Sequence, residues 1–274
     1  MNQKEKARIV ESAEAAYLAA TFAAAPADVA AELGMKVFQM WGGVAGIMAN
    51  DPSGGFWSRT IGIGIDRPIS TDFLEAIDSL YLANGGKSNL LQISPIAQPI
   101  NWEDLVEAAG YTRGRTWVKL LRELNDLPEV ESSLTVRELG VEDAPLYGKT
   151  YWAGFGMTHP VFEKWMNGHL GREDWRHFGA FDGKTMVGVG AMYLRGDVAC
   201  LSGASTLESY RGRGAQSALM VARLAAAAEM ELSWASTETA SETDDSPNHS
   251  LRNMQRLGFE VVYERYNWRK AYTA

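Results

Sequence analysis

The sequence predicts an α/β (α+β) protein made of two similar halves in tandem, each a mixed, mostly antiparallel sheet flanked by helices. Helix-like and strand-like segments alternate along the 274 residues, and the order found in the first half recurs in the second. Both halves also end on the same junction: Gly110 and Gly258 each end a predicted helix and precede an aromatic residue that begins the last strand. We expect domains over 1–128 and 133–274, joined by the polar segment 125–133.

The first half begins with a helix over 4–24, because Ile9, Ala13 and Tyr17 recur at helical spacing until Pro26 ends the pattern. Clusters of Gly, Pro, Asn and Asp separate the segments that follow. These are a short helix ending near Gly34, strands 36–41, 44–50 and 56–65, a helix 71–83, a strand 89–94, a helix 101–109 and a strand 111–121.

The second half repeats this order with one more strand at its start. Ser246 and Pro247 are expected as the N-cap and first residue of its last helix. The predicted segments are strand 134–139, helices 141–154 and 160–167, strands 176–182, 186–194 and 198–205, a helix after a Gly-rich loop to Met230, strand 232–237, helix 247–257 and strand 259–268.

Composition excludes several classes of protein. The formal charge of −8 lacks the basic stripe that a nucleic-acid backbone requires, so we expect no nucleic-acid partner. No window of about 18 apolar residues and no signal-like N-terminus occur, which favours a soluble, cytoplasmic protein that does not bind membranes. The single cysteine, Cys200, and four scattered histidines predict no metal site.

A Gly-rich loop, Arg211 to Ser217, joins strand 198–205 to the long helix after it. The first turn of a helix has unpaired amide groups, and two glycines allow the loop to turn these amides toward a ligand. Two arginines add positive charge, so the loop predicts a pyrophosphate site. No Lys follows the glycines, which excludes a nucleotide P-loop, and the residues after Gly214 break the dinucleotide pattern.

This loop resembles the acetyl-CoA signature of the GNAT (general N-acetyltransferase) superfamily, Arg/Gln-x-x-Gly-x-Gly/Ala. Arg211 and Gly214 match the signature, whereas Gln216 stands where the family prefers Gly or Ala, and the resemblance extends over most of 134–268. It implies acetyl-CoA as the acyl donor, bound between two parallel strands that splay apart and end near Thr206 and Glu238. The residues it implies for cofactor binding are Ser205, Thr206, Arg211, Gly212, Arg213, Gly214, Ala215, Gln216 and Ser217.

The first half lacks this loop. Its equivalent connection, 66–70, has no glycine and contains Pro68, which removes one amide donor. We therefore expect the first half to bind no cofactor, to pack on the second half and to wall part of the site.

The sequence offers several candidates for the catalytic acid and base. Many members of the family use a Tyr of the last helix as the acid, but Met254 occupies that position here. Glu238, at a strand end, is the first candidate for a base or an amine-binding carboxylate, with a cap or ion pair as the alternative. Glu208 is second, unless it simply pairs with Arg211. Donors to the thiolate could come from three tyrosines that could equally be packing residues, Tyr193, Tyr263 and Tyr266.

The resemblance implies transfer of an acetyl group to the primary amine of a small molecule, directly within a ternary complex because Cys200 is a poor candidate nucleophile. The segment 151–160 would roof the acceptor site, although its aromatic residues also fit core positions, and His159 is a weak candidate base. The alternatives are a non-catalytic CoA-binding sensor, suggested by Met254, and acetylation of a protein amine. A homodimer is one possible assembly.

Overall fold

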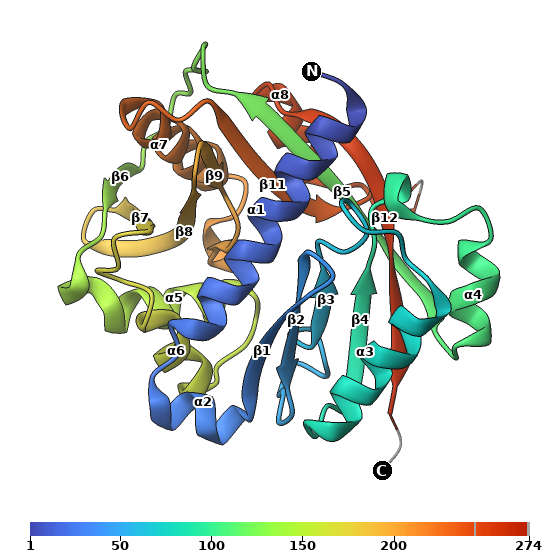
Figure 1. Cartoon of the computed structure of the whole chain (residues 1–274). Helices are drawn as coiled ribbons and strands as arrows, with labels where there is room; N and C mark the ends of the chain where they lie inside the picture. The colour runs from blue at the N-terminus through green and yellow to red at the C-terminus, as the bar shows by residue number, and fades with distance from the viewer. Residues whose placement is uncertain (244, 273–274) are drawn as a thin grey trace.

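The structure, a computed structural model, describes residues 1–243 and 245–272. Its strands form one sheet that runs through both halves in the order β1-β2-β3-β4-β12-β5-β11-β9-β8-β7-β6, with β10 paired to β8 (Figure 1). The helices are α1 (Gln3–Ala23), α2 (Ala27–Leu33), α3 (Thr71–Ala83), α4 (Trp102–Ala108), α5 (Ala144–Gly154), α6 (Pro160–Asn167), α7 (Ala215–Glu229) and α8 (His249–Arg256). The strands are β1 (Met35–Met40), β2 (Gly43–Met48), β3 (Arg59–Ile61), β4 (Ser88–Gln92), β5 (Thr112–Glu123), β6 (Thr135–Glu138), β7 (Trp175–Asp182), β8 (Thr185–Arg195), β9 (Val198–Cys200), β10 (Ala204–Thr206), β11 (Trp234–Ala240) and β12 (Glu260–Ala271).

The two halves exchange their closing strands. β5, the last strand of the first half, pairs with β11 of the second, so that Glu238 lies opposite Lys119. β12, the last strand of the second half, pairs with β4 of the first, with Trp268 opposite Leu91. β5 and β12 also pair with each other at the centre of the sheet. Each half therefore completes its sheet with a strand of the other.

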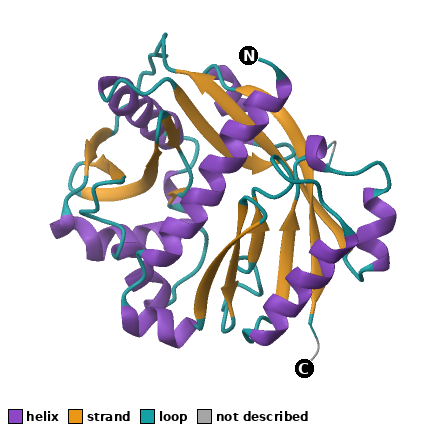
Figure 2. Ribbon diagram, in the orientation of Figure 1, coloured by secondary structure: helices purple, strands orange, loops and turns teal. Residues whose placement is uncertain are grey.

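Helix α1 crosses one face of this sheet and contacts strands of both halves (Figures 1 and 2). Asn2 caps it by accepting a hydrogen bond from the amide of Glu5. Its buried side includes Leu18 and Phe22, which pack with Trp165 and other residues of the second half. The same buried side carries two carboxylates, Glu11 and Glu14, each 1% exposed. The first half is thus fixed to the second by strand pairing and by this helix.

Two expected strands are shorter in the structure. The segment 198–205 is interrupted after Cys200, because Gly203 adopts a left-handed conformation with φ of 73° and redirects the chain into β10. The segment 56–65 keeps only Arg59–Ile61 as a strand, and the residues after it include two glycines with positive φ, Gly62 and Gly64.

The expected cap of the last helix was wrong. α8 begins at His249, and Asn248 is its N-cap. The Asn248 side chain accepts hydrogen bonds from the amides of Ser250 and Leu251, at 2.9 and 3.1 Å. Ser246 instead pairs through its backbone with Thr243 in an isolated β-bridge, which holds it outside the helix.

None of the helices in 1–243 and 245–272 combines the length and hydropathy needed to cross a bilayer. Within those same residues, no three His, Cys, Asp or Glu side chains are arranged to hold a metal ion.

Candidate active site

Two parallel strands part from each other near the middle of the second half. β9 pairs with the start of β11, Val198–Cys200 with Trp234–Ser236, and the amide of Leu201 still donates to the carbonyl of Ser236 at 2.8 Å. After Gly203 the chain, as β10, pairs with β8, while β11 continues along β5 to Ala240. A gap therefore opens between β10 and the second part of β11, and we call it the splay. Thr206 and Glu238 lie half-buried on its two sides.

The backbone of β10 presents hydrogen-bonding groups to the splay. Gly203 accepts from the amide of Ala191 and Leu207 donates to the carbonyl of Val187, both at 2.9 Å, and Ser205 lies opposite Val189. Hydrogen bonding in an antiparallel pair alternates along each strand, so Ala204 and Thr206 direct their amide and carbonyl groups away from β8 and toward the splay. The Ser205 hydroxyl donates to the carbonyl of Tyr151 at 2.8 Å, which attaches β10 to α5.

The Gly-rich loop follows β10 and leads into α7. Gly212 and Gly214 have φ of 76° and 81°, a left-handed conformation that favours glycine, and Gly214 is the N-cap of α7. A Cβ atom at Gly212 would meet nothing within 4 Å, and one at Gly214 would meet only the Ser132 hydroxyl at 3.9 Å. The space beside both glycines, next to the start of α7, is therefore open, as an anion site at the first amides of a helix requires.

The polar side chains of the loop mostly bond to the protein. Arg211 donates to the carbonyl of Gly154 at the end of α5 at 2.8 Å, and Arg213 pairs with Asp182 at 2.9 Å. Ser217 and Gln216 bond to Asn253 of α8, at 2.8 and 3.3 Å. These contacts position the loop between its neighbours. The carboxylate of Glu208, the second candidate base, belongs to an exposed 3-10 turn that precedes the loop.

Glu238 lies at the inner edge of the splay and contacts three cations. Arg59 of β3, Lys119 of β5 and Arg265 of β12 approach its carboxylate at 3.1, 3.3 and 3.2 Å. The side chain is 10% exposed. Three donors fill most of the roughly four lone-pair positions of a carboxylate and leave about one for a further donor. This arrangement corresponds to the ion-pair alternative for Glu238, with limited room to accept a hydrogen bond from a ligand.

The same three cations contact Glu14 of α1, at 2.7 Å for Arg59, 2.8 Å for Lys119 and 2.5 Å for Arg265. Burial alone would raise the pKa of Glu14, but the three neighbouring cations outweigh burial and hold its pKa well below the ordinary value. Glu11 pairs with Arg265 at 2.7 Å, which gives three carboxylates and three cations. We call these six residues the seam cluster.

The seam cluster could not be found from the sequence. Its members come from α1, β3, β5, β11 and β12, and the exchanged strands bring them together. One local signal is Lys119, a charged residue within the buried run 118–121 of β5.

The other candidate residues lie apart from the splay or within the core. Met254 is 6% exposed and packs with Leu251 and Phe259. Tyr263 donates to Glu11. Cys200 is buried, and burial raises the pKa of its thiol, which agrees with the expectation that it is a poor nucleophile. The aromatic residues of 151–165 are mainly core: Trp152, Phe162 and Trp165 are buried, and Phe155 is 51% exposed.

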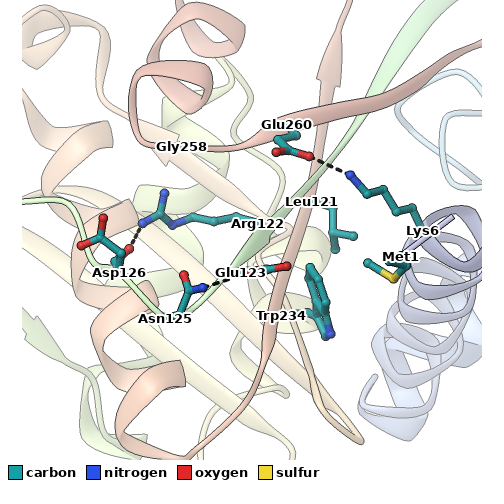
Figure 3. Close-up of a pocket in the computed structure, with 10 residues that line it drawn as sticks. All are labelled: Met1, Lys6, Leu121, Arg122, Glu123, Asn125, Asp126, Trp234, Gly258 and Glu260. Atoms are coloured by element: carbon teal, nitrogen blue, oxygen red, sulfur yellow. Dashed lines mark hydrogen bonds and ion pairs between the residues drawn. The ribbon is translucent and has the colours of Figure 1, made fainter. Parts of the chain in front are cut away.

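A cavity of about 350 Å³ lies at the amino end of β11, beside Trp234 (Figure 3). Its charged groups bond within the cavity wall: Lys6 pairs with Glu260 at 2.7 Å and Arg122 donates to the carbonyl of Asp126. Ligands of open α/β sheets collect at the carboxyl ends of strands, whereas this cavity lies at the amino end of β11. It is therefore separate from the splay.

Comparison with known proteins identifies the fold. The sequence matches no protein-family model and no curated protein. Among solved structures, the chain is similar to a GCN5-related N-acetyltransferase from Kribbella flavida, at 17% identity and a TM-score of 0.63, covering 97% of this chain and 96% of that one. It is also similar to a GCN5-related N-acetyltransferase from Sphaerobacter thermophilus, at 15% identity and a TM-score of 0.62, covering 86% and 76% of the two chains.

A third structure shares the two-part arrangement. It is a tandem GNAT protein from the clavulanic acid biosynthesis pathway, at 17% identity and a TM-score of 0.55, covering 78% of this chain and 74% of that one. Identities this low establish the fold and leave the substrate open. The parted strands, the loop at the start of α7 and these likenesses together show that the chain has the GNAT fold, with two GNAT-like halves in tandem.

Proposed function

We propose that this protein transfers an acetyl group from acetyl-CoA to the primary amine of a small molecule. The observation that carries the proposal is the order of three features along one stretch of chain: the splay, the outward-facing backbone of β10 and the Gly-rich loop. Outward-facing backbone groups at Ala204 and Thr206 precede a loop whose two glycines have open space beside them, next to the first amides of α7. An extended amide-containing chain fits the first part of this stretch, and a pyrophosphate fits the second.

The residues present suit the cofactor. Gly212, Gly214 and the amides of Ala215, Gln216 and Ser217 would hold the pyrophosphate, and the backbone of Ala204 and Thr206 would bond to the pantetheine arm. Bound acetyl-CoA would supply the thioester. The first half would wall the acceptor side, since Arg59 and Lys119 already reach Glu238 there. Glu238 has room for one more hydrogen bond, so we assign it to holding the acceptor amine rather than to removing its proton.

Calorimetric titration with acetyl-CoA and a thiol-release assay across a panel of amines test this proposal. Gly214→Trp would place a large side chain in front of the α7 amides, and we expect it to abolish binding of acetyl-CoA. Leu82→Trp, at an exposed position of α3, is the matched control, and we expect its affinity to equal that of the wild type. Unchanged affinity in Gly214→Trp would reject the assignment of the loop.

A non-catalytic CoA sensor is the second candidate, and two observations favour it. Met254 fills the core where the family often has an acid, and the seam cluster already supplies Glu238 with three donors. A sensor would bind acetyl-CoA and release no thiol with any amine. Acetylation of a protein amine would instead give turnover with peptides and none with small amines.

A further inference from the structure

Two tyrosine hydroxyls meet at the bend between β9 and β10. A Cβ atom built at Gly203 would lie 3.3 Å from the hydroxyl oxygen of Tyr17 and 3.4 Å from that of Tyr151. Tyr17 comes from α1 of the first half and Tyr151 from α5 of the second. The side chains are 6% and 4% exposed, while Gly203 and its two neighbours are half-buried. Both phenols therefore extend from the core and end beside the open splay.

The next amide after Gly203 is that of Ala204, the first group of β10 that faces the splay. A Cβ atom and the following backbone nitrogen are three bonds and about 3–3.7 Å apart, so each hydroxyl lies within about 7 Å of the Ala204 nitrogen. Two donors up to about 6 Å apart can reach one common oxygen, since each hydrogen bond spans about 2.7–3.1 Å. The hydroxyls and the amide thus approach the same small volume from different sides.

Both hydroxyls are suited to donate. Burial is the main cause that raises the pKa of Tyr17 and of Tyr151 above the ordinary value, so each phenol keeps its proton at neutral pH. Neither charged carboxylate of the seam cluster on α1 is aimed at them, because Glu11 and Glu14 pair with Arg265.

We propose that Tyr17 and Tyr151, together with the Ala204 amide, form a hydrogen-bonding pocket for the thioester oxygen. This inference rests on the proposed function. When the acceptor amine forms its bond to the carbonyl carbon, negative charge moves onto that oxygen, and the three donors stabilise it. The C–S bond then breaks, CoA leaves as a thiolate, and the proton lost by the amine goes to the thiolate or to water. The phenols remain intact, and no other reagent is consumed.

One consequence concerns the tandem arrangement. Tyr17 belongs to the first half, which lacks the Gly-rich loop, so that half supplies a donor to the site as well as a wall.

The test uses a pair of ligands that needs no known acceptor. Acetyl-CoA has the thioester oxygen and CoA lacks it, so the ratio of their affinities reports on donors to that oxygen. Tyr17→Phe and Tyr151→Phe remove only the hydroxyls. We expect each to weaken acetyl-CoA binding about three- to tenfold while CoA binding stays unchanged, and the double variant to lose more.

Tyr147→Phe is the matched control. Tyr147 lies one turn before Tyr151 on α5, is also buried, and its hydroxyl has no hydrogen-bond partner in the described part of the chain. Its affinity ratio should equal that of the wild type. If the double variant keeps the wild-type ratio of acetyl-CoA to CoA affinity, the pocket is rejected, while the assignment of acetyl-CoA binding is kept. Failure of the wild type to bind either ligand would reject the proposed function and the pocket with it.

Discussion

Replacing Glu14 by Gln is the most direct test of the seam cluster. The Glu14 carboxylate is 1% exposed and contacts Arg59, Lys119 and Arg265 at 2.7, 2.8 and 2.5 Å. The substitution keeps the shape of the side chain and removes its charge, which leaves three buried cations with two carboxylates. Breaking a buried ion pair by removing one partner costs about 3–5 kcal/mol, so we expect the free energy of unfolding to fall by about that amount.

Thermal unfolding measures this loss. A chain of 274 residues has an unfolding entropy of about 0.6 kcal/mol/K, so the expected decrease in Tm is about 5–9 °C. The control is Asp28→Asn. Asp28 pairs with Lys164 at a similar distance, 2.9 Å, but both side chains are about 65% exposed, so this substitution should leave Tm unchanged. A Glu14→Gln protein that melts within about 2 °C of the wild type would refute the reasoning.

The effect should also depend on pH in a defined direction. The pKa of Glu14 is lower in the folded state than in the unfolded state, so its stabilisation is present above the unfolded value of about 4.3. That stabilisation is lost as the pH falls through the folded pKa. The difference in Tm between wild type and Glu14→Gln should therefore be constant from pH 7 to 5 and should shrink below about pH 4.3.

Three further substitutions test the site and the fold. Glu238→Gln should raise the KM for the acceptor amine and leave CoA affinity unchanged, because the carboxylate has room for one more donor; a loss confined to kcat would instead identify a base. His177→Phe should make the stability of the protein less sensitive to acid. Burial and His169 lower the pKa of His177 to about 3, so at pH 5 the unfolded histidine takes up a proton and the folded one does not. The free energy of unfolding of the wild type should therefore be about 2 kcal/mol lower at pH 5 because of this histidine. Urea unfolding at pH 7 and pH 5 gives this loss for each protein, and an equal loss in the wild type and in His177→Phe would contradict the expectation. Asn248→Ala removes the cap of α8 and should lower the free energy of unfolding by about 1 kcal/mol in urea, whereas Ser246→Ala should change it little.

The elements were largely predictable because their limits are local. Helix α3 begins and ends as predicted, at Thr71 and Ala83, since Asn84 and two glycines follow it. Helix α6 also matches its predicted range, with Pro160 at its first position. The positive φ of Gly212 and Gly214 follows from the same local chemistry, and so does the start of α7 beside them.

The site was only partly predictable because its other half depends on contacts between distant segments. Nothing near Glu238 in the sequence identifies Arg59, Lys119 or Arg265 as its partners, since these residues are brought together by strand exchange. The approach of Tyr17 to Gly203 likewise requires α1 to cross both halves. The cap at Asn248 was missed for a smaller reason: Ser-Pro and Asn are both good helix starts, and the backbone bridge at Ser246 decides between them.

The exchange of β5 and β12 has a consequence for folding during synthesis on the ribosome. β4 reaches its partner only when residues 267–271 have been made, so until then one edge of the first sheet is exposed and open to pairing with other chains. Neither half can complete its sheet early, and the final step joins β12 to strands of the other half of the sequence, which makes folding slow. We therefore expect that the nascent chain needs a holding chaperone and that either half expressed alone aggregates.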